Sequence, residues 1–205
     1  MKHTPQAQAM RSALTLLAFA VVATAVLGTT WALTADQIAA NEAAARAALL
    51  SQALPPGSFD NDLVADARPL PARDAAMLGR DTARVYPARL AGRLSGRVFE
   101  AAAPNGYGGR IELLVGVDAA GAVTGVRVVS HKETPGLGDY IDSAKSAWSA
   151  QFAGVADAPG MAWAVKKDGG RFDAPAGATI SARAVAAAVG RVARYAREHP
   201  HLANP

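Results

Sequence analysis

A stretch of 22 residues without a charge, Ser12–Leu33, constrains this chain more than any other part of the sequence. It reads SALTLLAFAVVATAVLGTTWAL, and a helix needs roughly 20 mainly apolar residues to cross the hydrocarbon core of a bilayer. Lys2 and Arg11 precede the stretch, and Asp36 follows it. Because basic residues favour the cytoplasmic side, the sequence predicts a cytoplasmic segment 1–11, a transmembrane helix 12–33 and a remainder on the far side, which in a bacterium is the periplasm.

Two alternatives to a membrane anchor are open. In the first, the stretch is a signal peptide cleaved near Thr30-Trp31-Ala32, although the apolar part of such peptides spans only about 7–15 residues. In the second, it is a buried core helix, which the absence of any polar face disfavours. Length and composition together favour the anchor.

Beyond this stretch, composition separates a helical stalk from a globular domain. Residues 34–54 are rich in alanine, which predicts that the helix continues until Pro55-Pro56-Gly57 ends it. Residues 55–205 then form one domain with a single core. Up to about Arg84 this domain mixes prolines with short apolar clusters, and these predict loops and short helices that pack on the core.

Two antiparallel strands are the clearest local prediction. Arg110–Val117 and Ala122–Ser130 are rich in β-branched residues, and Asp118–Gly121 between them suits a tight turn. Shorter β-prone clusters lie around Val85-Tyr86 and at 97–100. A sheet therefore occupies the middle of the domain.

Apolar residues at helical spacing predict two helices, Asp139–Phe152 and Ala178–His199. The second has one apolar arc, with arginines on the opposite side and near its end, where the helix dipole favours them. The arc consists of Ala184, Val185, Ala188, Val189, Val192 and Tyr195. A sheet with packed helices gives an α+β fold class.

Overall composition limits the function classes. The formal net charge is +4, but the basic residues are spread along the chain, with no run that could follow a nucleic-acid backbone. The chain has no cysteine, so thiolate nucleophiles, iron–sulfur clusters and cysteine-bound zinc are excluded. No G-x-S-x-G motif or defensible pair of acids indicates hydrolysis. A redox role would need another cofactor.

Two glycine-containing loops are candidate ligand contacts. In Gly106–Gly109, the glycines permit a close backbone approach and Tyr107 offers a ring for stacking, although a simple turn explains the same residues. In the loop HKETPGLGD, which begins at His131, Glu133 and Thr134 offer polar groups to a ligand. A structural role for this loop is equally compatible with its sequence.

The segment DAPAGATIS, Asp173–Ser181, enters the last predicted helix. The first amides of a helix have no partner within it, and its dipole is positive there, so an anion suits this place. Thr179 is alternatively a capping hydroxyl, and Ser181 a residue that merely fills the first turn.

Four segments in this order, after an N-terminal membrane helix, resemble the G subunit of the Rnf ion-translocating oxidoreductase. They are GYGGRIELLVGVD, VVSHKETPGLGD, VKKDGGRFD and GATIS. The family attaches flavin at a motif Asp-x-x-Ser/Thr-Gly-Ala-Thr with a further hydroxyl residue two positions on. Ala176 departs from this motif, because the family has Ser or Thr there. The matching positions are Asp173, Gly177, Ala178, Thr179 and Ser181.

The resemblance implies FMN joined through its phosphate to the Thr179 hydroxyl by a separate flavin transferase that draws on FAD. The flavin would lie against Tyr107 and the loop that contains Glu133, Thr134 and Leu137. The implied role is an electron carrier, with no independent catalytic site, in an inner-membrane complex. That complex couples electron transfer between ferredoxin and NAD to Na⁺ or H⁺ translocation, so the other Rnf subunits are the implied partners.

Two alternatives to this family assignment are open. The first is the C subunit of the sodium-translocating NADH:quinone oxidoreductase, which shares the flavinylated domain. The second is a membrane-anchored periplasmic scaffold or binding protein that keeps the fold without the flavin, a loss that Ala176 would permit.

Overall fold

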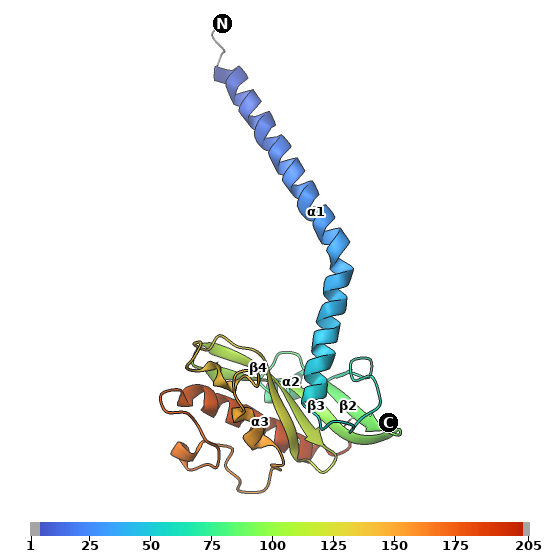
Figure 1. The fold of residues 1–205 in the computed structure, drawn as a ribbon, viewed down its shortest axis with the longest axis vertical. Coiled ribbons are helices and arrows are strands. Elements are labelled where there is room, and N and C mark those ends of the chain that lie inside the picture. The colour runs from blue at the N-terminus through green and yellow to red at the C-terminus, as the bar shows by residue number, and fades with distance from the viewer. Residues whose placement is uncertain (1–4, 203–205) are drawn as a thin grey trace. The chain divides into compact units, whose positions relative to one another are not determined.

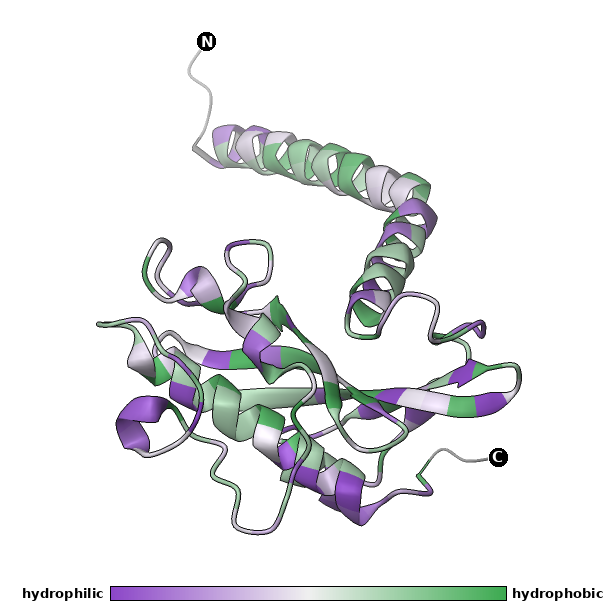
Figure 2. Cartoon of the chain, turned by 60° about the horizontal axis from the view of Figure 1, so that its bottom comes forward, coloured by the Kyte–Doolittle hydropathy of each residue, from purple (hydrophilic) through white to green (hydrophobic). Residues whose placement is uncertain are grey.

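The computed structural model describes residues 5–202 and contains one long helix and one compact unit. The helix is α1 (Pro5–Gln52; Figure 1). It is mainly hydrophobic over the stretch that the sequence assigns to a membrane span (Figure 2). Within it, Gln8–Gln52 is long and apolar enough to cross a membrane. The helix continues through the predicted stalk and ends before Pro55, where two prolines cannot extend it. Its division into cytoplasmic, membrane and stalk parts stays a prediction.

The compact unit begins at Arg46, before the boundary at Pro55 that the sequence predicts. Its core is an antiparallel sheet in the order β1-β2-β3-β4-β5 (Figure 1). The predicted hairpin is confirmed as β4 and β5. The elements are β1 (Arg68–Pro69), α2 (Ala72–Met77), β2 (Arg84–Leu90), β3 (Arg93–Gly106), β4 (Gly109–Asp118), β5 (Val123–Ser130) and α3 (Thr179–Glu198). These confirm the α+β class.

Each face of the sheet has its own apolar cluster. On one face, α3 packs against β3 and β4, and every residue of its predicted apolar arc is buried. On the other face, the end of α1 and the following loop cover Tyr86, Val98 and Leu114. Successive side chains of β3 point to opposite faces of the sheet, so this strand contributes to both apolar clusters.

The loop after α1 lies unusually close to the sheet. Thr124 donates a hydrogen bond to the carbonyl of Ala53 at 2.7 Å. A Cβ atom on Gly116 would lie 2.0 Å from that same carbonyl oxygen. Only glycine at this position of β4 allows the contact.

The predicted helix Asp139–Phe152 is wrong. The segment contains two short 3₁₀ helices, η1 (Asp139–Ile141) and η2 (Trp148–Phe152), joined by turns. Asp142 accepts a hydrogen bond from the amide of Ala144, and Ser146 donates one to the carbonyl of Tyr140. Such side-chain bonds to the nearby backbone compete with a regular helix.

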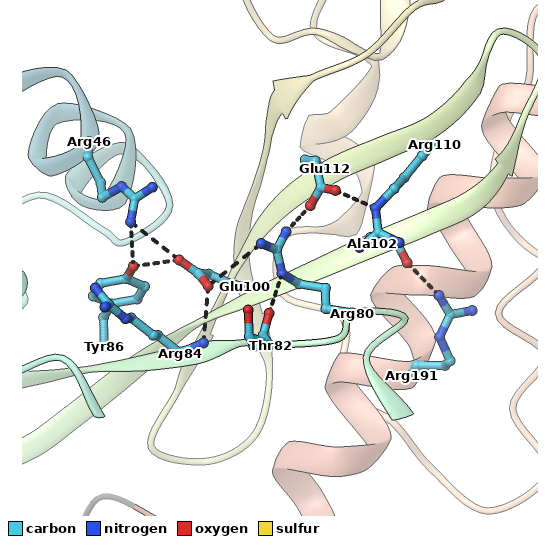
Figure 3. Close-up of polar contacts among 10 residues, drawn as sticks. All are labelled: Arg46, Arg80, Thr82, Arg84, Tyr86, Glu100, Ala102, Arg110, Glu112 and Arg191. Atoms are coloured by element: carbon cyan, nitrogen blue, oxygen red, sulfur yellow. Dashed lines mark hydrogen bonds and ion pairs between the residues drawn. The ribbon is translucent and has the colours of Figure 1, made fainter. Parts of the chain in front are cut away.

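A row of alternating charges lies on the sheet face opposite α3 (Figure 3). Glu100 contacts Arg46 at 3.6 Å and Arg80 at 4.0 Å, and Arg80 also pairs with Glu112. The carboxylate of Glu100 is largely buried and accepts a hydrogen bond from the hydroxyl of Tyr86 at 2.6 Å. The row thus ties the end of α1 to β2, β3 and β4.

We expect alkaline pH to destabilise the fold through Tyr86. Burial, and then the hydrogen bond and charge of Glu100, raise the pKa of Tyr86 to about 12. The resulting stabilisation is complete below the unfolded pKa of about 10 and is lost as pH rises from about 10 to about 12. The melting temperature of the detergent-solubilised chain should fall over this interval, and Tyr86→Phe should show a smaller fall. An equal fall in the variant would assign the effect to other groups.

Candidate functional site

One pocket of the compact unit collects most of the predicted site residues. It has a volume of about 420 Å³, part of which is open solvent. Three chain segments line it: the β3–β4 turn, the loop after β5 and the start of α3. Seven of the nine predicted residues are in its lining: Tyr107, Glu133, Thr134, Leu137, Gly177, Ala178 and Ser181. Thr179 and Asp173 are not.

Helix α3 begins at this pocket without a side-chain cap. Its N-cap residue is Ala178, which has no side chain able to accept a hydrogen bond, and its first turn has no acidic residue. Thr179 is the first helical residue and is half-buried, so the structure does not support its alternative role as the capping residue. The positive end of a 20-residue helix is therefore available to an anion beside the Thr179 hydroxyl.

A tight turn leads into the helix. The amide of Ala178 donates a hydrogen bond to the carbonyl of Pro175 at 3.3 Å, and Gly177 has φ +84°. A positive φ at the third position of a turn favours glycine. Ala176 and Gly177 are exposed, so the turn presents the segment before Thr179 to the surroundings.

Both ends of this segment are held by the rest of the unit. At its start, the indole nitrogen of Trp148 donates to the carbonyl of Asp173 at 2.6 Å, and the Asp173 amide donates to Gln151 at 2.7 Å. At its end, the hydroxyl of Tyr140 donates to the carbonyl of Ala178 at 2.8 Å. Burial raises the pKa of Tyr140 to about 12, so this donor stays protonated at neutral pH.

The side chain of Asp173 pairs with Lys166 and is not part of the pocket lining. Its carboxylate lies 2.7 Å from the ammonium of Lys166, and both side chains are mostly exposed. An exposed ion pair of this kind contributes little to stability, about 0–1 kcal/mol.

Glu133 is the buried charged group of the pocket. It is only 4% exposed, and each of its carboxylate oxygens accepts a hydrogen bond. The amide of Gly108 donates to Oε1 at 3.0 Å, and the hydroxyl of Ser181 donates to Oε2 at 2.5 Å. One carboxylate thus contacts both of the other segments that line the pocket.

Exposed apolar side chains surround the opening. Tyr107 is 68% exposed, Leu137 49% and Ile180 46%, and each comes from a different lining segment. Large apolar side chains are normally buried, so three of them at one pocket indicate a binding surface for an apolar group.

Two lining residues were not predicted, Gly138 and Ile180. Both adjoin predicted residues, since Gly138 ends the E-T-P-G-L-G loop and Ile180 lies between Thr179 and Ser181. In residues 5–202, no group of three or more His, Asp or Glu side chains could hold a metal ion.

Family models match two parts of the chain. Residues 106–194, which include the whole pocket, match an FMN-binding domain. Residues 1–53, which include α1, match the RnfG N-terminal region.

Curated relatives match over most of their length. The G subunit of the ion-translocating oxidoreductase complex of Pseudomonas aeruginosa (strain UCBPP-PA14) is 47% identical, covering 91% of this chain and 87% of that protein. The G subunit of Aliivibrio fischeri (strain ES114) is 45% identical, covering 92% and 90%. That of Yersinia pestis is 42% identical, covering 93% and 91%. Among solved structures, Shewanella oneidensis NqrC is 24% identical with a TM-score of 0.47, covering 72% of this chain and 73% of that one.

Proposed function

Because the chain belongs to the family of RnfG, the G subunit of the ion-translocating oxidoreductase complex, we propose that it carries electrons by a covalently bound FMN. The flavin phosphate is joined to the Thr179 hydroxyl as a phosphoester, attached by a flavin transferase. The complex couples electron transfer between ferredoxin and NAD to translocation of Na⁺ or H⁺. The match of residues 1–53 to the RnfG N-terminal region supports this assignment over the C subunit of the sodium-translocating NADH:quinone oxidoreductase.

The observation that carries this proposal is the uncapped start of α3 at the edge of the pocket. A phosphodiester keeps one negative charge, and the free amides and dipole of a helix start stabilise such a charge. Neither Ala178 nor Gly177 places a bulky side chain beside Thr179. The residues present therefore fit a phosphate attached at this hydroxyl.

The pocket also fits the flat part of the cofactor. Tyr107, Leu137 and Ile180 offer apolar surface on its sides, and Thr134 adds a polar group. Aromatic and aliphatic walls with few polar groups are typical of cofactor sites.

FMN supplies the redox chemistry, and the chain binds and orients it and shields it from water. Hydrogen bonds from Tyr140, Trp148 and Gln151 hold the attachment segment in place. No side chain is required to act as a catalytic acid, base or nucleophile, so the proposal includes no independent catalytic site.

A scaffold without flavin is the competing function, and the mass of the purified protein distinguishes the two. Full-length chain produced together with a flavin transferase should gain the mass of one FMN less one water, and the flavin should persist after acid denaturation. Protein made without the transferase is the control. An unmodified mass in both preparations would refute the proposed attachment, and with it the view that Ala176 is tolerated in the motif.

We further propose that the chain spans the bacterial inner membrane once, with its N-terminus in the cytoplasm and residues 55–205 in the periplasm. The apolar helix α1 and the basic residues before it support this topology. Protease added outside spheroplasts should digest the compact unit, and disruption of the membrane should add no further cleavage of that unit. If the compact unit resists the protease until the membrane is disrupted, the proposed orientation is wrong.

A further inference from the structure

We infer that Glu133 is the positioning residue of the pocket, which holds the β3–β4 turn and the first turn of α3 in register around the cofactor. The inference rests on the proposed function for the identity of the cofactor. The contact between Glu133 and the other two segments is a property of the protein alone.

Glu133 connects parts of the chain that are far apart in sequence. Gly108 lies 25 residues before it and Ser181 lies 48 residues after it, and each donates to a different carboxylate oxygen. Hydrogen bonds to a charged group are stronger than neutral ones. Since Ser181 is two residues after Thr179, the carboxylate also holds the helix turn that carries the proposed attachment site.

The surrounding glycines make room for this side chain. A Cβ atom on Gly106 would lie 2.6 Å from Glu133 Oε1, and one on Gly138 would lie 2.9 Å from Oε2. A Cβ atom on Gly108 would lie 2.0 Å from the carbonyl oxygen of Lys132, next to Glu133. The glycines of the two loops thus permit the buried carboxylate, in addition to any approach of a ligand.

The same position brings a negative charge to the pocket wall. Glu133 is part of the lining although it is only 4% exposed, so water screens its charge weakly. A fixed negative charge beside a bound flavin opposes uptake of electrons. Glu133 would therefore lower the reduction potential as well as order the pocket.

The first test uses the full chain in detergent, made without flavin transferase. In Glu133→Ala, the amide of Gly108 loses its acceptor, and its hydrogen exchange, measured by NMR, should accelerate about tenfold or more. Ser181→Ala should leave this amide protected, because Glu133 still accepts from Gly108. Glu100→Gln is the matched control, since Glu100 is also a largely buried carboxylate but lies on the sheet face opposite α3 (Figure 3). Unchanged exchange in Glu133→Ala would overturn the inference, whatever the cofactor.

The second test uses the flavinylated chain. Glu133→Gln removes the charge with little change in shape, so the midpoint potential of the flavin should shift to a more positive value. A change of about tenfold in the equilibrium constant for one-electron reduction would correspond to about 59 mV. Glu100→Gln should leave the potential near that of the unaltered chain. A potential unchanged in Glu133→Gln would show a purely structural residue and overturn the role toward the cofactor, whereas failure of the unaltered chain to acquire flavin would refute the proposed function instead.

Discussion

Thr179→Ala is expected to abolish covalent flavin completely while the compact unit stays folded. The substitution removes the Thr179 hydroxyl, which lies at the uncapped start of α3 and is the proposed attachment point. Because the N-cap is Ala178 and no side chain caps the helix, the loss should cost less than the roughly 1 kcal/mol typical of a capping residue. Intact mass and in-gel flavin fluorescence after denaturation measure the attachment, and the melting temperature measures folding.

Two further variants make this result specific. Thr179→Ser keeps a hydroxyl at the same place and should retain covalent flavin at a reduced level. Ser181→Ala removes the other hydroxyl of the motif, which is buried and donates to Glu133, and should still be flavinylated at Thr179. Covalent flavin that persists in Thr179→Ala but disappears in Ser181→Ala would move the attachment site to Ser181.

Local patterns predicted the elements that depend on near neighbours in sequence. Turn residues between two β-branched runs predicted the β4–β5 hairpin, and apolar periodicity predicted α3 to within one residue at each end. The end of α1 before Pro55 follows from proline geometry. In each case the signal and the structure lie within the same short segment.

Features that depend on particular side-chain hydrogen bonds could not be predicted in this way. The spacing of apolar residues in 139–152 suggested a helix, but Asp142 and Ser146 bond to the backbone and break the segment into two short turns of 3₁₀ helix. The rings of Trp148 and Phe152 lie within η2 and pack edge to face at 5.3 Å, so these two apolar residues meet much as they would on a regular helix.

The pocket shows the same limit. The resemblance to a family named most of the residues that line it, but did not show that Glu133 bonds to Gly108 and Ser181. Those contacts require three segments to meet in the folded chain. The sequence of Gly106–Gly109 suggests a close approach of a ligand, whereas part of the role of Gly106 is to make room for the buried side chain of Glu133.

Gly190→Ala is expected to destabilise the compact unit, against the intrinsic preference of helices for alanine. In an unpacked helix this change would stabilise by about 1 kcal/mol. Here a Cβ atom would lie 2.4 Å from both Cβ and Cγ of Trp163. Trp163 cannot rotate away easily, because its ring stacks on Phe172 at 5.4 Å and its indole donates to Asp157 at 2.7 Å. Overpacking of this kind typically costs about 1–3 kcal/mol.

The effect should reach the flavin attachment segment as well as the overall stability. Phe172 immediately precedes Asp173, so displacement of Trp163 would disturb the start of the segment that leads to Thr179. We expect a melting temperature lower by roughly 3–10 °C and a reduced yield of covalent flavin. Ala187→Gly, at an exposed position of the same helix, should lower stability by only about 1 kcal/mol and leave flavin attachment unchanged. A higher melting temperature in Gly190→Ala would contradict this prediction. It would mean that the loop around Trp163 moves without loss of stability, and that its contact with α3 does not position the attachment segment.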